Sequence, residues 1–349
     1  MPNSALFLTD IWYLALPGNA LKSGQMTAKS ILGQSLLFGR AKTGEPFALR
    51  NICPHRGIPL SYGRFDGCEV ECCYHGWRFN TGGVCTDIPS LLPEQKFNIS
   101  RVKVFKFPCH EVQGNLWVYI PPPGKPIPKT LPPIPCVPDV GNIAPQLQFN
   151  KHFPCDIDHA VVGLMDPAHG PFVHRSWWWR SQKSMHPKAK KFAPTPLGFK
   201  MVRHPPSKNS KAYKLLGGEI STEISFQLPG VRIEHIQAGR HTVCALTTLT
   251  PLEESVTEIH QFFYWTLPGW TAIFKPLARS FARAFLNQDY EVIVKQQEGL
   301  KENPQLMLIN DADTQAKWYQ QLKKEFILAQ TENRQFQHPL TETVLRWRS

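Results

Sequence analysis

The sequence predicts an α+β protein of two domains, an all-β domain followed by an antiparallel sheet with packed helices. Three observations predict this fold class. The chain has 349 residues, which exceeds the roughly 100–200 residues of one ordinary domain. Short β-like runs come first and amphipathic helical patterns come last. A proline-rich stretch separates the two parts, so we expect the domain boundary there.

The predicted first domain covers residues 8–122. It contains short strand-like runs broken by glycine, namely IWYLALPG, SLLFGRAKTGEPFALR and NLWVYI, at the spacing of a small all-β domain. From Pro121 to Pro138 the chain reads PPPGKPIPKTLPPIPCVP. Proline cannot continue a helix or a central strand and favours a semi-rigid, extended chain. Residues 123–144 are therefore predicted to form a connector.

The predicted second domain covers residues 145–349. Four strand-like runs follow one another: EISTEISFQL, VRIEHIQ, HTVCALTTL and TEIHQFFYWTL. In the first run Ile224, Phe226 and Leu228 alternate with polar residues, which is typical of a sheet with one buried face. Helical periodicity appears later, at about residues 272–300 and 312–329. This order predicts an antiparallel sheet with helices packed against it.

Composition restricts the cellular setting. No window approaches the roughly 18 uninterrupted apolar residues of a membrane span, and the start MPNSALFLTD lacks a basic segment leading into a long apolar one. We therefore expect a cytoplasmic protein. Its nine cysteines are then better interpreted as metal ligands or structural thiols than as disulfides.

Four residues of the first domain have the spacing of metal ligands. They read Cys53-x-His55 and, after sixteen intervening residues, Cys72-x-x-His75. Two cysteines and two histidines are also an ordinary zinc set, so zinc is one alternative. Each loop mixes one thiolate with one imidazole, however, which favours a [2Fe–2S] cluster with two thiolates on one iron and two histidines on the other.

The remaining cysteines are not expected to be ligands. Cys73 lies between Cys72 and His75 and is interpreted as a spacer. The other six are expected to be small buried hydrophobic residues, as free cysteines often are; they are Cys68, Cys85, Cys109, Cys136, Cys155 and Cys244.

The loops CPHRG and CCYHGW resemble the two ligand loops of Rieske domains in ring-hydroxylating and related oxygenases. The match includes the four ligand types, their inner spacings, Gly57, Gly76 and Trp77. Respiratory Rieske proteins usually carry an extra cysteine in each loop, and the first loop here has none. The resemblance covers nearly the whole chain and implies a catalytic domain of the helix-grip type after the connector.

The same resemblance implies a mononuclear iron site in the second domain. Asp166-x-x-His169-x4-His174 is similar to the family motif in which two histidines bind Fe(II) and the aspartate bridges to the cluster of a neighbouring subunit. Asp289 is the expected third ligand. It lies 115 positions after His174 in QDYEVI, which resembles the late acidic motif of the family. On a helix it would also share the apolar face of Leu286.

Two nearby residues need comment. His159 could compete as a ligand beside Asp156 or Asp158, but it does not fit the motif and is expected to be structural. Many relatives place asparagine three residues before the bridging aspartate, and this chain has Gly163 there. That departure removes no predicted ligand.

The resemblance implies the terminal component of a Rieske oxygenase. Electrons from NAD(P)H would arrive through a ferredoxin or a flavin reductase, and O₂ would hydroxylate or oxidatively demethylate a hydrophobic substrate, aromatic or terpenoid-like. A homotrimer is expected, and a small second subunit stays possible. The alternative is a catalytically silent Rieske electron carrier or redox sensor. Aromatic residues could line the substrate pocket but are more often core; they are Trp177–Trp179 and Phe262–Trp265.

The formal net charge of +12 would suit an acidic partner, nucleic acid or an anionic membrane surface, and does not by itself choose among them. A basic face could attract an acidic electron donor, and the lysine-rich stretch from Lys183 to Lys214, including Lys188, Lys190 and Lys191, is expected to be an exposed loop or hairpin. Nucleic-acid binding is not favoured, because no recognised motif accompanies the lysines. The segment WTLPGWTAIFKPLARSFARAFL mixes apolar and basic residues, so it is either an entrance helix packed on the sheet or a peripheral membrane contact.

Overall fold

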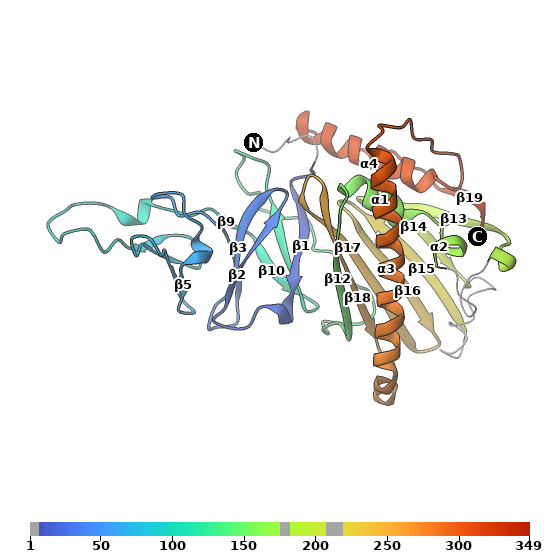
Figure 1. The fold of residues 1–349 in the computed structure, drawn as a ribbon, viewed down its shortest axis with the longest axis horizontal. Helices are drawn as coiled ribbons and strands as arrows, with labels where there is room; N and C mark the ends of the chain where they lie inside the picture. Colours follow the sequence, from blue (N-terminus) through green and yellow to red (C-terminus); the bar gives the residue numbers. More distant parts are fainter. Residues whose placement is uncertain (1–6, 175–181, 207–218) are drawn as a thin grey trace. The chain divides into compact units, whose positions relative to one another are not determined.

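The computed structural model describes residues 7–174, 182–206 and 219–349 (Figure 1). The chain divides into two compact units. The first is Met1–Cys136 together with Thr250–Glu253, and the second is Val137–Leu249 together with Glu254–Ser349. Trp177–Trp179 and residues 207–218 lie outside the described residues.

The first unit is built from short antiparallel strands in three sheets, ordered β1-β11-β10, β2-β3-β4-β9 and β5-β6-β7-β8. The strand β11 has all six residues buried, which explains why Asn115 is followed by the uninterrupted apolar run LWVYI. The elements are β1 Ile11–Pro17, η1 Gly18–Ala20, β2 Met26–Ile31, β3 Gln34–Arg40, β4 Pro46–Arg50, η2 Leu60–Tyr62, β5 Arg64–Phe65, β6 Glu69–Glu71, β7 Arg78–Asn80, β8 Cys85–Asp87, η3 Ile99–Arg101, β9 Lys106–Phe107, β10 Cys109–Val112 and β11 Asn115–Ile120.

The second unit is one eight-stranded antiparallel sheet with helices on it, in the order β12-β18-β17-β16-β15-β14-β13-β19. The long helix α3 lies in front of the sheet in Figure 1. The elements are β12 Leu147–Phe153, α1 Ile157–Met165, α2 Gly170–Val173, η4 Gln182–Ser184, β13 Pro187–Thr195, β14 Gly198–His204, β15 Ile220–Gln227, β16 Val231–Ala238, β17 His241–Glu253, β18 Val256–Trp265, η6 Gly269–Phe274, α3 Lys275–Leu300, α4 Thr314–Thr331 and β19 Thr343–Arg348.

Aromatic side chains attach the helices to the sheet. Trp318 of α4 makes edge contacts with Phe192 and Phe199, at ring-centroid distances of 5.5 and 5.1 Å. At the other end of the sheet, Tyr290 of α3 contacts Phe153 of β12 at 5.6 Å. Such pairs add to the stabilisation gained from buried apolar area. Helices held at both ends of the sheet leave room between them for a cavity.

The α+β prediction is confirmed, since an all-β part is followed by an antiparallel sheet with helices. All four strand-like runs are strands, β15 to β18, and the two late helical patterns are α3 and α4. Within the described residues no helix is long and apolar enough to cross a membrane.

Two expectations about individual residues are wrong. Cys68 and Cys136 are exposed rather than buried, because each lies in an irregular segment at the surface. Lys188 is buried rather than exposed: it lies in β13, is 8% exposed, and its Nζ donates to Ser349 Oγ at 2.8 Å. The hairpin alternative for the lysine-rich stretch is confirmed in part, because β13 and β14 form a hairpin of the main sheet.

Candidate functional site

The two cysteine-histidine loops of the first unit have the same backbone hydrogen bonds. In each, the cysteine N–H donates to the carbonyl five residues later, and the cysteine carbonyl accepts from the glycine N–H four residues later. These distances are 2.8 and 2.9 Å in the first loop and 2.8 and 3.0 Å in the second, formed by Cys53, Gly57 and Ile58 and by Cys72, Gly76 and Trp77. The two loops are therefore equivalent turns.

The glycines of these turns have positive φ values. Gly57 is at +74° and Gly76 at +70°. Glycine adopts this conformation at little cost, whereas other residues are strained there. The glycines that the sequence pattern singled out therefore close the two turns.

The side chains of the two loops meet. Cys53 and Cys72 are 1% and 3% exposed and belong to the hydrophobic core of the unit. The rings of His55 and His75 lie 4.4 Å apart between centroids. Trp77 stacks on His55 at 4.5 Å with an interplanar angle of 4°. The thiols are thus on the inner side of the loops, and His75 is exposed at the surface.

These four residues fit a [2Fe–2S] cluster. His55 Nδ1 is buried without a hydrogen-bond partner, which is costly unless something binds it. Burial, together with the neighbouring Cys72 thiol, raises the pKa of the Cys53 thiol to about 11. A bound metal offsets that penalty, because a coordinating thiol is deprotonated. Two inner thiols and two outer imidazoles are the donor set of a Rieske cluster.

The zinc alternative is disfavoured by the same geometry. Ligands of one tetrahedral zinc ion, at about 2.0–2.3 Å from it, lie within about 4 Å of one another. Among the described residues, the only group of three or more His, Cys, Asp or Glu side chains that converges in this way is His169, His174 and Asp289. The four loop residues do not converge on one point.

The second candidate centre begins with the two histidines that flank α2. His169 is the residue before this short helix and His174 the residue after it. One helical turn thus brings their Nε2 atoms to 3.2 Å, although five positions separate them in the sequence. His174 is buried and stacks on Phe285 at 4.4 Å between ring centroids.

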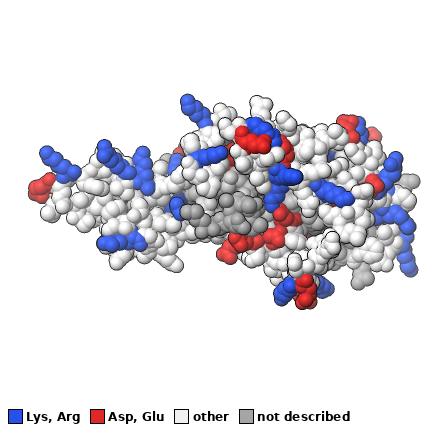
Figure 2. All heavy atoms as spheres, turned by 90° about the horizontal axis from the view of Figure 1, so that it is seen from above, with Lys and Arg blue, Asp and Glu red and all other residues white. Residues whose placement is uncertain are grey.

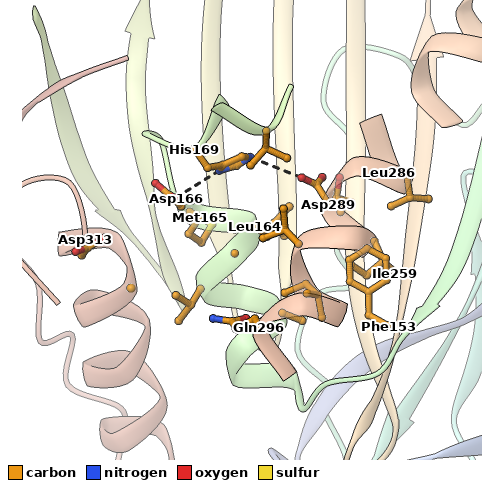
Figure 3. Close-up of a pocket in the computed structure, with 18 of the residues that line it drawn as sticks. Phe153, Leu164, Met165, Asp166, His169, Ile259, Leu286, Asp289, Gln296 and Asp313 are labelled. Carbon is orange, nitrogen blue, oxygen red and sulfur yellow. Dashed lines mark ion pairs between the residues drawn. The ribbon is translucent and has the colours of Figure 1, made fainter. Parts of the chain in front are cut away.

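Asp289 completes this centre from the long helix α3. Its Oδ1 lies 3.0 Å from His174 Nε2 and 3.8 Å from His169 Nε2. Donor atoms about 2.1 Å from one metal ion and roughly at right angles lie about 3 Å apart. The observed separations therefore fit a mononuclear iron with two histidines and one carboxylate. Figure 3 shows Asp289 pointing toward His169 across the cavity.

Hydrogen bonds orient both imidazoles. His174 Nδ1 lies 3.0 Å from Gln288 Oε1, so Nδ1 donates and the Nε2 lone pair faces the other two donors. His169 Nδ1 lies 3.5 Å from Asp166 Oδ2, and the Ala168 N–H donates to Asp166 Oδ1 at 2.7 Å. Sequence reasoning missed Gln288, since nothing in its local pattern distinguishes it from the other glutamines of α3.

The charge state of Asp166 follows from these contacts. Burial opposes its ionisation, but the hydrogen bonds from His169 and from the Ala168 N–H outweigh burial and hold its pKa below the usual range. Burial likewise opposes protonation of His169, and Asp166 and Asp289 raise its pKa overall. Asp166 is therefore an ionised partner that polarises His169.

A cavity of about 210 Å³ opens beside this centre (Figure 3). Its walls come from α1, α3 and the sheet, and they include Asp166, His169 and Asp289 themselves. Most of the other lining side chains are apolar; they include Phe153, Leu164, Met165, Ile259, Leu286 and Ile293. The centre thus faces a small, largely apolar space.

Other residues raised by the sequence lie elsewhere. His159 Nδ1 is 2.6 Å from Asp156 Oδ2, at the N-terminus of α1 and outside the three-residue centre. Phe262 and Tyr264 are buried in the core, whereas Ile259 and Gln261, on the opposite face of β18, line the cavity. The cavity-lining residues of this strand are therefore not its aromatic ones.

The class defined by this fold and these two centres is an oxygenase with a Rieske domain and a mononuclear iron domain. Residues 11–108 match the family described as Rieske [2Fe-2S] domain, and residues 155–329 match the one described as vanillate O-demethylase oxygenase C-terminal domain. The chain belongs to the Rieske non-heme iron oxygenase family. The predictions of the family and of a [2Fe–2S] domain are confirmed.

Known relatives agree with this assignment. The chain is 29% identical over 182 residues to chlorophyllide a oxygenase of Arabidopsis thaliana, covering 50% of this chain and 31% of the relative. It is 31% identical over 165 residues to 4beta-methylsterol monooxygenase of Methylococcus capsulatus, covering 44% of each. The matches thus span about half of this chain and less than half of these relatives.

Solved structures share the whole fold. Dicamba monooxygenase bound to dicamba superimposes with a TM-score of 0.72 over 94% of this chain and 99% of that chain, at 19% identity. A variant of NdmA from Pseudomonas putida with caffeine has a TM-score of 0.70, at 18% identity, covering 93% of this chain and 92% of that one. At these identities the likeness concerns the fold alone.

Proposed function

We propose that this protein is the terminal component of a Rieske oxygenase that hydroxylates or oxidatively demethylates a hydrophobic substrate. O₂ and electrons from NAD(P)H, delivered by a ferredoxin or flavin reductase, are the proposed co-substrates. The observation that carries the proposal is the convergence of His169, His174 and Asp289 beside an apolar cavity. An electron carrier would have no use for a substrate-sized space at that point.

Each residue of the centre has a separate proposed role. Iron held by two histidines and one carboxylate keeps positions open for dioxygen and supplies the oxygen-activating chemistry. His169, His174 and Asp289 would hold it, while Gln288 fixes the His174 tautomer through the 3.0 Å contact. The apolar walls exclude water and place the substrate against the open side of the centre.

We also propose the electron path that the family resemblance suggested. Cys53, His55, Cys72 and His75 hold the cluster, and the exposed His75 is the outlet. Asp166, bound to His169, would accept a hydrogen bond from His75 of a neighbouring subunit in a homotrimer and so bridge the cluster to the mononuclear centre. Asp166 suits this role because its side chain is 32% exposed while one oxygen remains tied to the Ala168 N–H.

The cavity narrows the proposed substrate class. A cavity of about 150 Å³ accommodates benzene, so about 210 Å³ accommodates a substituted ring rather than a whole polycyclic skeleton. Relatives named for chlorophyllide and methylsterol oxygenation act on larger molecules. We therefore propose that one ring, or one ring substituent, of an aromatic or terpenoid-like molecule enters the cavity.

Two measurements test the proposal. Protein purified anaerobically should contain about three irons per chain, two in a cluster with a Rieske EPR signal and one mononuclear. A surrogate reductase should then support substrate-dependent O₂ consumption with some member of a panel of aromatic, methoxylated and terpenoid compounds. About two irons and no O₂ consumption would support the electron carrier instead, and zinc without iron would exclude both.

A further inference from the structure

The first turns of α3 are almost entirely exposed. Residues 276–281, 283 and 284 are all exposed, although they belong to a helix of 26 residues. In Figure 1 these turns extend beyond the ends of the sheet strands. Buried positions appear only farther along the helix, at Leu286 and Ile293. The start of α3 therefore does not pack against the hydrophobic core.

Apolar side chains are part of this exposed segment. Ile273, in the preceding η6, is 75% exposed, and Leu277 is 55% exposed. Single exposed apolar residues are common on protein surfaces. Two on successive turns, one at the end of η6 and one at the start of α3, favour instead a surface that meets another apolar phase.

Basic side chains accompany them. Lys275, Arg279 and Arg283 follow one another at four-residue intervals along one face of α3, with Ser280 and Asn287 beside them. Residues 259–288 contain no Asp or Glu. Within the described part of the chain, no carboxylate lies within ion-pair distance of these three cations. Their charge is thus available to an external anion.

The overall charge does not create this arrangement by itself. On the face drawn in Figure 2, Lys and Arg side chains are scattered and interleaved with Asp and Glu. Elsewhere, prominent cations have acidic partners, such as Lys191 with Glu342 at 2.7 Å and Arg334 with Glu325. The row on α3, which has no acidic partner among the described residues, therefore differs from the general excess of positive charge.

We propose that the start of α3 docks the protein on an anionic lipid bilayer. Ile273 and Leu277 enter the interface, and Lys275, Arg279 and Arg283 bind the phosphate groups of the lipid headgroups. An exposed apolar face opposite a row of basic residues, with no acids in the segment, is the composition of an interfacial helix. An acidic soluble protein would account for the cations but gives no role to the two protruding apolar residues.

Docking at this point would serve the proposed reaction. The same helix carries Leu286, Asp289 and Ile293 at the cavity, two to four turns farther along. A hydrophobic substrate is concentrated in the bilayer rather than in water. The proposed membrane contact rests on the exposed surface and not on catalysis, so it can be tested without a substrate.

The test is co-sedimentation of the full-length protein with vesicles of neutral phosphatidylcholine or of phosphatidylcholine with 30% phosphatidylglycerol. We expect binding to the anionic vesicles only, weakened by salt. Each basic residue near such a surface increases affinity about fivefold, so Arg279→Glu/Arg283→Glu should lose at least about 25-fold. Leu277→Ser should lose about tenfold. Both positions are exposed and glutamate is a good helix former, so the double variant should fold.

The matched control is Lys301→Glu/Lys324→Glu, which changes the net charge equally at two exposed lysines away from the start of α3. Its affinity for anionic vesicles should stay within about twofold of that of the unchanged protein. Iron content and circular dichroism, unchanged in all variants, verify folding. Equal losses in both double variants, or equal binding to neutral vesicles, would overturn the proposal. The proposal would also be overturned if Arg279→Glu/Arg283→Glu still bound anionic vesicles but changed the oligomeric state or the rate at which the donor reduces the protein.

Discussion

The two candidate metal centres are built in opposite ways. In the first unit, 23 residues contain all four ligands, from Cys53 to His75, and each ligand pair lies in one closed turn. In the second unit, the ligands span residues 169–289, and α3 must pack on the sheet before Asp289 reaches the histidines. The geometry of a centre with neighbouring ligands is set by its own backbone turns. The geometry of a centre with ligands far apart in the sequence depends on the tertiary fold.

The supporting contacts differ in the same way. Backbone hydrogen bonds and two glycines with positive φ shape the cysteine-histidine loops. Side chains from other elements orient the second centre, because Gln288 holds His174 and Asp166 holds His169. The first centre should therefore be sensitive to the exact register of its loops, and the second to single side chains around it.

The register of the second loop gives the largest expected effect. Cys72 is buried beside Cys53, whereas Cys73 is exposed. Cys72→Ser should remove the cluster, its EPR signal and about two irons per chain, because serine is a poor substitute for the thiolate. Cys73→Ser should keep the signal and the iron. Retention of the cluster in the Cys72 variant with loss in the Cys73 variant would shift the ligand register by one residue.

Asp166→Asn should have the next largest effect. Asparagine can still accept from the Ala168 N–H, but it removes the charge that faces His169. We expect turnover to fall about 10–100-fold or more while about three irons remain bound. Iron analysis and EPR measure the bound metals, and donor-driven O₂ consumption measures turnover. Normal coupled turnover in this variant would contradict the proposed bridge.

Gln288 is a positioning residue whose effect should be confined to the second centre. Gln288→Ala removes the acceptor of His174 Nδ1–H and should weaken Fe(II) affinity about 10–100-fold. The cluster EPR signal should not change, because the local turns of the first unit do not depend on α3.

Two further variants separate this effect from general damage to the helix. Gln288→Glu also offers an oxygen to His174 and should restore most of the affinity. Gln296→Ala, two turns later on the same helix and at the cavity wall, should change Fe(II) affinity less than about twofold. An equal loss in the Gln288 and Gln296 variants would mean that α3 packing, and not the tautomer of His174, controls iron binding.

The difference between the two centres also explains what the sequence could predict. Short spacings and strand periodicity depend on neighbouring residues, so the cysteine-histidine loops and β15 to β18 were predictable. Gln288 and the burial of Lys188 depend on contacts with His174 and with Ser349, 114 and 161 positions away. No local pattern encodes such partners. The opposite error was made for Cys68 and Cys136. Burial was predicted from the average preference of free cysteines, but both residues lie in surface segments.

The smallest expected effect concerns Gly163, the position where the family resemblance led us to expect asparagine. It lies within α1 and lines the cavity, and a Cβ added there would meet only Ile293 Cδ1, at 3.8 Å. Glycine inside a helix costs about 0.5–1 kcal/mol relative to alanine. Gly163→Ala should therefore raise the free energy of unfolding by about that amount, measured by denaturant titration.

The same methyl group should cost activity on bulky substrates. It takes space from a cavity of only about 210 Å³, and one methyl group changes discrimination about 10-fold or more. We expect kcat/KM to fall for the largest accepted substrate and to change little for the smallest. A uniform fall for all substrates would indicate disturbance of Asp166 at the end of α1. A stabilised protein with selectively reduced activity would show that Gly163 is kept for space at the expense of helix stability.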